Sequence, residues 1–312
     1  MENIQDNIQN LVTIKTDIKD IFDDTNVKVT DGMKSYGDYI SEMSGNVGTA
    51  VLFNLQYSTF EITPDFGEDV EFDIYQYISS EGVFAHCPNL KEARYYKNLP
   101  SNSTFEGCSK LTTVPAYKWD KFPVKMDGTF KDCRELEDVS QIQVSNCVRM
   151  SGTFYNCYSL KNLPIFDLTS ISSNDYTADK GLSFTFWNCT SLVEAPEILL
   201  PSDGWRANNS CTGAFMGCTN LVSVPAYNMG WSYYNSLMFS GCVSLQHLGG
   251  FLQLGSSLSL SDSPLLTHDS LMNVINNLAN TSSATLNLGE TNLAKLTEDE
   301  IAIAINKGWT LT

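Results

Sequence analysis

The chain is poor in basic residues and has no long hydrophobic run. It has 19 Lys and Arg residues against 36 Asp and Glu residues, a formal net charge of −17 over 312 residues. A nucleic-acid-binding protein neutralises phosphates with Lys and Arg, so this balance argues against that class. The apolar runs are far shorter than the roughly 18 residues that a transmembrane helix needs. The sequence therefore predicts a globular protein that binds neither nucleic acid nor a membrane.

A secretory signal is not visible in the first residues, which read Met1-Glu2-Asn3-Ile4 with no cationic region and no apolar core. We therefore expect the chain to be made and kept in a reducing compartment. Disulfides are rare in such a compartment, so the nine cysteines need another explanation.

Catalytic and metal-binding motifs are also missing. The three histidines, His86, His247 and His268, are scattered, and no Cys-x-x-Cys, P-loop, Gly-x-Ser-x-Gly or His-Glu-x-x-His occurs. We predict no cofactor, no metal and no enzymatic activity. A glycosidase with two carboxylates is not excluded by sequence, because that pair is set in space.

A repeat accounts for seven of the cysteines. The motif Phe-x-x-Cys-x-x-Leu occurs seven times, beginning at Phe84, Phe105, Phe130, Phe154, Phe186, Phe215 and Phe239. Three residues after each Leu stands another apolar residue, and in four copies a Pro follows it directly. Units that repeat in this way stack into solenoids, because one unit cannot bury its apolar face alone.

The repeated Phe, Cys and Leu positions predict internal ladders of buried side chains. The Leu-x-x-apolar segment should begin a short strand, which Pro then ends. Cysteine is a small residue that packs well when buried. The alternative, metal or redox chemistry, is disfavoured because the thiols are not closely paired. Cys211 is expected in the core, whereas Cys147 fits no ladder.

The Phe-x-x-Cys-x-x-Leu-x-x-apolar-Pro unit, over residues of roughly 80 to 250, resembles the BspA-like class of leucine-rich repeat. That class occurs in bacterial surface proteins and in bacteriophage structural proteins. The resemblance implies a curved, strand-rich solenoid used for adhesion or recognition, without catalytic activity. We place the seven repeats at residues 81–250.

Residues 251–312 predict a strand–helix cap. Leu271, Val274 and Ile275 have helical spacing, and Thr297 with Glu300 forms a capping box that begins a second helix. Such a cap keeps the open end of a solenoid from aggregating.

The N-terminal residues 1–47 predict a helical module. An apolar stripe on a polar helix indicates a coiled coil of two or three strands, although a helix folded back on its own domain is the alternative. The stripe consists of Ile4, Ile8, Leu11, Ile18 and Phe22. The order of short pieces in this module is similar to N-terminal modules of head and tail appendages from crAss-like phages of Bacteroidales. Residues 48–80 predict a β-rich N-terminal cap.

Two wide repeats carry aromatic residues that packing does not require. Insertions after Pro in adjacent repeats protrude on one face, so these side chains could stack on sugars or contact a protein. The candidate ligand-binding residues are Tyr176 and Trp205 in the two insertions, and Trp231, Tyr233 and Tyr234 at the matching place of the following repeat. The alternative is that they cover the edge of the core. A calcium site among Asp175, Asp179 and Asp203 lacks EF-hand spacing.

Together these patterns predict an α+β chain in which a helical module precedes a strand-rich solenoid and its cap. The first functional hypothesis is a phage head or tail fibre in the virion. Its N-terminus would oligomerise and join other virion proteins, and its repeats would face a host-surface glycan or protein. The second hypothesis is a bacterial leucine-rich-repeat adhesin or protein–protein interaction module.

Overall fold

The computed structural model describes residues 51–54, 59–62, 85–86, 88, 102–114, 116, 118–119, 124–145, 147–169, 181–200, 211–228 and 235–312. The predicted helical module at residues 1–47, with Ile4, Ile8, Leu11, Ile18 and Phe22, lies outside these residues. Of the predicted N-terminal cap, only the antiparallel pair β1 (Val51–Asn54) and β2 (Thr59–Ile62) is described.

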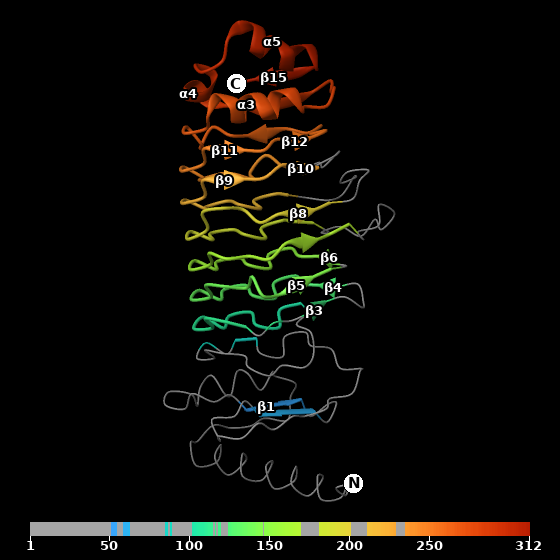
Figure 1. Ribbon diagram of the computed structural model, residues 1–312, viewed down its shortest axis with the longest axis vertical. Helices are drawn as coiled ribbons and strands as arrows, with labels where there is room; N and C mark the ends of the chain where they lie inside the picture. The colour runs from blue at the N-terminus through green and yellow to red at the C-terminus, as the bar shows by residue number, and fades with distance from the viewer. Residues whose placement is uncertain are drawn as a thin grey trace, which may run out of the picture.

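The described repeats stack along the long axis of the molecule in chain order, so that each repeat contacts the one before and the one after it (Figure 1). Short parallel strands join the repeats, because equivalent residues of successive repeats lie side by side. One sheet has the order β3–β5–β7–β8, formed by Lys118–Trp119, Gln143–Val144, Phe166–Asp167 and Ile198–Leu199. This is the strand-rich solenoid architecture that the repeat predicts.

Further parallel pairs continue the same arrangement. β4 (Val124–Lys125) pairs with β6 (Cys147–Arg149), and β10 (Tyr227–Asn228) pairs with β12 (Phe251–Leu252). β9 (Ser223–Val224) pairs with β11 (His247–Leu248), and single bridges join Thr113, Asp138 and Asn162 at the equivalent position of earlier repeats.

Proline separates two ladders instead of ending the strand region. Pro164, Pro196 and Pro225 each follow the first ladder position, and β7, β8 and β10 begin two residues later. Proline lacks the N–H that a ladder needs, so it breaks pairing locally, but the chain resumes pairing beyond it. The expectation that Pro ends the strand is therefore only half correct.

The repeated phenylalanines form a continuous stack in the core. Successive rings from Phe105 to Phe239 lie 5.1–5.7 Å apart with interplanar angles of 2–9°. Their backbone N–H groups also pair between repeats, as in the 2.8 Å bond from Phe154 N–H to the Thr185 carbonyl. Threonines directly before the phenylalanines form a further buried ladder at Thr104, Thr129, Thr153 and Thr185.

The residue before each repeated cysteine has a left-handed backbone. These residues have φ between 59° and 77°, and they are His86, Gly107, Asp132, Asn156, Asn188, Gly217 and Gly241. Gly, Asn and Asp tolerate this conformation best, which explains why they recur there. Their side chains also connect repeats, since Asn188 donates to Asn156 and Asn156 donates to Asp132.

The repeat geometry runs past residue 250. Leu260, Ser263 and Leu266 occupy the Phe, Cys and Leu slots of an eighth, degenerate copy, and all three are buried. Ser263 donates its hydroxyl to the Cys242 carbonyl at 3.0 Å, so a polar residue serves in the cysteine slot.

The C-terminal region has the predicted strand–helix character. β13 (Leu258–Ser259), β14 (Ala284–Asn287) and β15 (Trp309–Leu311) form a parallel sheet, and α3 (His268–Asn276), α4 (Gly289–Leu293) and α5 (Glu298–Asn306) surround it (Figure 1). The predicted capping box of Thr297 and Glu300 is confirmed. Within the described part of the chain, no helix is long and apolar enough to span a membrane.

Candidate binding face

All five predicted ligand-binding residues lie outside the described residues: Tyr176, Trp205, Trp231, Tyr233 and Tyr234. The candidate binding face consists of other residues.

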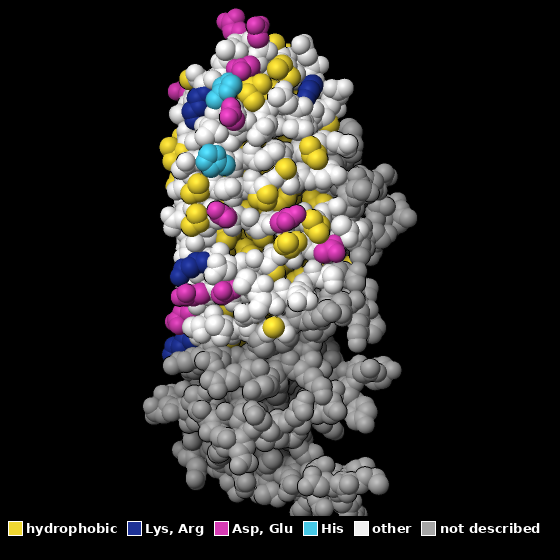
Figure 2. Space-filling view, in the orientation of Figure 1, with side chains coloured by type: hydrophobic (Ala, Val, Ile, Leu, Met, Phe, Trp, Pro, Cys, Tyr) yellow, Lys and Arg dark blue, Asp and Glu magenta, His cyan; other side chains and the backbone are white. Residues whose placement is uncertain are grey.

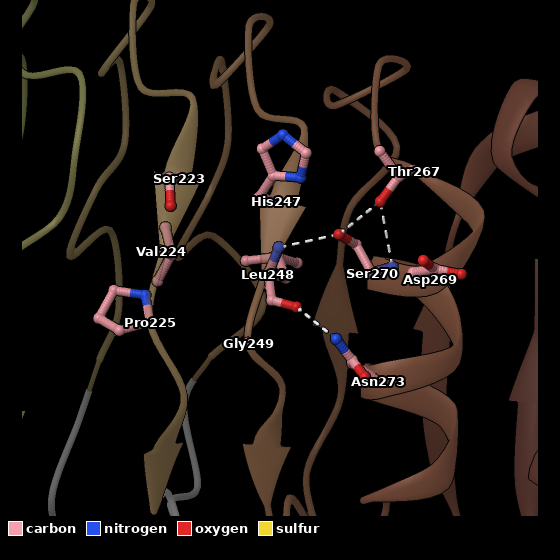
Figure 3. Close-up of a pocket in the computed structure, with 10 residues that line it drawn as sticks. All are labelled: Ser223, Val224, Pro225, His247, Leu248, Gly249, Thr267, Asp269, Ser270 and Asn273. Atoms are coloured by element: carbon pink, nitrogen blue, oxygen red, sulfur yellow. Dashed lines mark hydrogen bonds between the residues drawn. The ribbon is translucent and has the colours of Figure 1, made fainter.

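A pocket of about 440 Å³ lies where α3 meets strands β9 and β11 (Figure 3). The first ladder runs through this place, because Glu194 pairs with Ser223 and Ser223 pairs with His247. The pocket is lined by Ser223, Val224, Pro225, His247, Leu248, Gly249, Thr267, Asp269, Ser270 and Asn273.

Two polar side chains of the pocket hold α3 against β11, the last strand of the first ladder. The Ser270 hydroxyl accepts a hydrogen bond from the Leu248 N–H at 3.0 Å and donates to the Gln246 carbonyl at 2.9 Å. The Asn273 amide donates to the Leu248 carbonyl at 3.1 Å. These side chains satisfy the backbone groups that a further strand would otherwise pair, so the helix ends the ladder (Figure 3).

The remaining polar side chains of the pocket are available to a ligand. Ser223 and His247 lie on neighbouring strands, and Asp269 lies on the first turn of α3 with its side chain 98% exposed. A hydroxyl, an imidazole and a carboxylate beside the apolar Val224 and Pro225 can hold a polar or cationic side chain.

Exposed apolar side chains lie on the repeats that precede the pocket, on both sides of the prolines that separate the two ladders. Ile165 is 54% exposed, Val193 50% and Leu199 40%, which the packing of the repeats does not require. Figure 2 shows hydrophobic and acidic side chains together at the level of β8. Phe166 and Ile198 pair between neighbouring repeats. Ile165 and Glu197 come directly before them, so these two residues occupy equivalent places in the two repeats.

Charges are paired between repeats in the earlier part of the solenoid. Lys131 lies 2.7 Å from Glu106, Arg149 lies 2.5 Å from Asp127, and Lys161 lies 3.1 Å from Glu137. Burial of Glu106 acts to raise the pKa of its carboxyl, but the hydrogen bonds from Lys131 and Ser103 outweigh burial and lower it. Burial of Asp127 outweighs its pairing with Arg149 and raises the pKa. Among the described residues, Glu194 and Glu197 have no such cation.

An aromatic cluster on the turn side was not predicted. The Trp187 ring lies 5.0 Å from both Tyr155 and Phe184, and Phe184 has the unusual φ of 56°. Tyr155 and Trp187 each follow a ladder phenylalanine in adjacent repeats, so aligning the repeats by their Phe residues would have revealed the pair.

The described cysteines are buried and free, as packing requires. Thiols in this slot donate to the carbonyl of the preceding repeat, as Cys189 does to Phe154 at 3.2 Å. Burial raises the pKa of the Cys147 and Cys242 thiols to about 12, which keeps them protonated and unreactive. Cys147, which fitted no ladder, lies in β6 and donates to the Arg149 carbonyl at 3.3 Å. No group of three or more His, Cys, Asp or Glu in the described parts could hold a metal ion.

Comparisons with known proteins place the repeat in a family. Among solved structures, a leucine rich cell surface protein from Faecalibacterium prausnitzii is similar at 16% sequence identity and a TM-score of 0.24, over 82% of this chain and 97% of that one. No curated protein matches the chain. The family model of the BspA type leucine rich repeat region matches residues 68–183 in six copies. The chain therefore carries a BspA type leucine rich repeat region.

Proposed function

We propose that this protein is a recognition module of the adhesin or protein–protein interaction type, which binds a macromolecule through its repeats without catalysing a reaction. The observation that carries the proposal is an exposed apolar surface beside the pocket: Val193 precedes Glu194, which is on the same ladder as His247, and exposed Ile165 lies beyond Pro164 in the preceding repeat. Repeat solenoids commonly offer such extended faces to partners.

Exposed aliphatic side chains have a cost in water that a folded repeat could avoid with polar residues. Val193 stands at the outward position where the neighbouring earlier repeats carry Glu137 and Lys161, so the fold itself accepts charge there. A contiguous apolar surface rimmed by polar groups is typical of an interaction site. Contacts with a partner would bury the apolar side chains that the solenoid leaves exposed to water.

The test compares two valines of equal exposure. Val193 and Val243 are each 50% exposed, but Val243 follows Cys242 on the turn side and does not line the ladder. Labelled full-length protein is applied separately to immobilised capsular polysaccharide and to outer-membrane protein from Bacteroidales cells. We expect binding to one of them that Val193→Asp weakens about tenfold and Val243→Asp leaves unchanged. Equal losses, or binding to neither surface, would overturn the proposal.

The virion appendage is the second candidate, and the stripe at the N-terminus favours it. The stripe from Ile4 to Phe22 has the spacing of a coiled coil, which a fibre would use to oligomerise. The repeat family does not separate phage from bacterial proteins, so we place the interaction module first. The mass of the full chain in solution, compared with the chain lacking residues 1–47, tests this candidate. A monomer in both cases would contradict it.

A further inference from the structure

We propose that Ile165, Val193, Glu194, Glu197 and Leu199, here called the acidic face, bind a cationic protein segment that alternates Lys or Arg with apolar residues. This inference rests on the proposed function and specifies the chemistry of the partner. It begins from the contrast between the paired carboxylates of the early repeats and the two unpaired glutamates here.

Among the described residues, no cation pairs with Glu194 or Glu197, and Lys161 of the preceding repeat pairs with Glu137 instead. Between residues 181 and 294 the sequence contains a single Lys or Arg, Arg206. In the earlier repeats, Glu106 and Glu137 each have a lysine from the next repeat within about 3 Å. Glu194 and Glu197 are exposed and lie in one repeat, so their negative fields add. A partner that supplies cations is therefore complementary to this face and to the net charge of −17.

The apolar members of the acidic face are aliphatic. Sugar recognition typically uses aromatic rings, whose flat faces stack on the sugar, whereas valine, leucine and isoleucine pack against apolar peptide side chains. The exposed Glu197, directly before β8, and the exposed Leu199 in β8 flank the buried Ile198, which places a charge and an apolar side chain two residues apart on the surface. A strand turns every second side chain to one side, so an extended segment presents both kinds to this surface when Lys or Arg and an apolar residue alternate at every second position.

The pocket extends the acidic face at one end. Glu194 pairs with Ser223, and Ser223 lines the pocket together with His247 and Asp269. A basic side chain that enters the pocket would meet the exposed side chain of Asp269. The N-terminal end of α3 opposes a cation there, and Asp269 in its first turn offsets that effect.

The test uses a short fluorescent peptide, called the Lys–Leu peptide, in which every second position carries Lys and Leu in turn, with Ser at the positions between them, and anisotropy follows its binding to the full-length protein. Two peptides serve as comparisons: the Lys–Ser peptide has Ser in place of Leu, and the Glu–Leu peptide has Glu in place of Lys. We expect the Lys–Leu peptide to bind most tightly, and its affinity to fall about tenfold between low salt and ~0.3 M salt. Equal binding of the Lys–Ser or Glu–Leu peptide would overturn the inference.

A matched pair of double variants separates local contact from total charge. Glu194→Gln with Glu197→Gln should weaken Lys–Leu binding about tenfold. Glu290→Gln with Glu298→Gln removes the same charge from exposed cap residues and should leave binding within about twofold. Equal effects of the two pairs would overturn the inference. Melting curves of all variants confirm that each one is folded.

The outcome distinguishes this inference from the proposed function. Polysaccharide binding that Val193→Asp abolishes, without binding of the Lys–Leu peptide, would overturn the cationic partner and leave the recognition role intact. Self-association that Val193→Asp abolishes would show that the face seats a second copy, which also overturns the inference.

Discussion

The thiol of Cys157 donates a hydrogen bond to the carbonyl oxygen of Phe130, one repeat earlier, at 3.0 Å. The same bond recurs from Cys133 to Phe105 and from Cys218 to Phe186. The cysteine therefore has two roles: its side chain fills space in the core beside the stacked rings, and its thiol connects each turn to the preceding one by a hydrogen bond. Ser263, in the same slot of the degenerate copy, also donates to the preceding repeat, but to the carbonyl of Cys242 and not to that of its phenylalanine.

We first predict that Cys157→Ala lowers the free energy of unfolding by about 2 kcal/mol. The change leaves a small cavity and removes the donor, although the Phe130 carbonyl keeps its bond from the Cys133 N–H. Cys157→Ser retains a donor and should cost about half as much. Urea unfolding measures both. A serine variant that is no more stable than the alanine variant would show that the thiol bond contributes nothing.

Burial of the thiols also predicts a loss of stability in alkali. An unfolded thiol titrates near pH 8.5, whereas burial raises the pKa of Cys147 and Cys242 to about 12 in the folded protein. Between these values the folded state holds more protons than the unfolded state, so stability present below about pH 8.5 is lost as the pH rises.

Urea midpoints at successive pH values above 8.5 check this prediction. Cys147→Ala should make the decline shallower by about 1.4 kcal/mol per pH unit, because one titrating thiol is gone. An unchanged decline would contradict the assignment of the effect to the thiol. Since ionisation requires opening, the described thiols should also resist iodoacetamide until the protein is denatured.

The left-handed slot gives a third prediction. Gly241 has φ 77°, and a Cβ there would meet only Gly217, at an ordinary 3.6 Å. Gly241→Ala therefore tests backbone conformation without a clash, and it should cost about 1–2 kcal/mol. Gly241→Asn should cost less, because asparagine occupies this slot at Asn156 and Asn188. Thermal or urea unfolding of the two variants measures the difference. Equal costs would refute the conformational explanation.

The repeat core could be predicted from sequence because each ladder needs one residue type at one slot. Phe105, Cys108 and Leu111 recur at fixed spacing, and the structure buries each of them completely. The degenerate copy escaped notice because Leu260 and Ser263 replace Phe and Cys with different residues of compatible size. Helix α4 has only five residues, too few for a helical period to stand out.

The candidate site was harder to predict than the core. Val193 and Glu197 occupy outward positions whose residue type varies between repeats, so no ladder marks them. Their significance comes from register, which places Glu197 beside Ile165 of the preceding repeat. It also comes from the finding that no cation among the described residues pairs with Glu194 or Glu197. Trp205 and Tyr233 stand out in the sequence instead, because aromatic residues outside the core ladders are conspicuous without any three-dimensional information.

The end of the solenoid provides the last prediction, which concerns Asn292. Its side chain is completely buried, and its amide nitrogen donates to the carbonyls of Ser263 and Leu288 at 3.1 Å and of Leu260 at 3.3 Å. Its amide oxygen accepts from Lys295, which also donates to the Pro264 and Leu266 carbonyls. These two side chains supply the donors that a further repeat would otherwise provide.

Asn292→Asp keeps the shape of the side chain but replaces the donor with an acceptor. The three carbonyls would then face a buried carboxylate, and although Lys295 remains beside it, we expect a loss of about 3 kcal/mol in the free energy of unfolding. Asn280→Asp makes the same chemical change at an exposed position and should shift the free energy by less than about 0.5 kcal/mol. Urea unfolding of both variants decides the matter. Similar losses would mean that charge alone, and not the missing donor, destabilises the cap, whereas a loss confined to Asn292→Asp would show that the buried amide donor stabilises it.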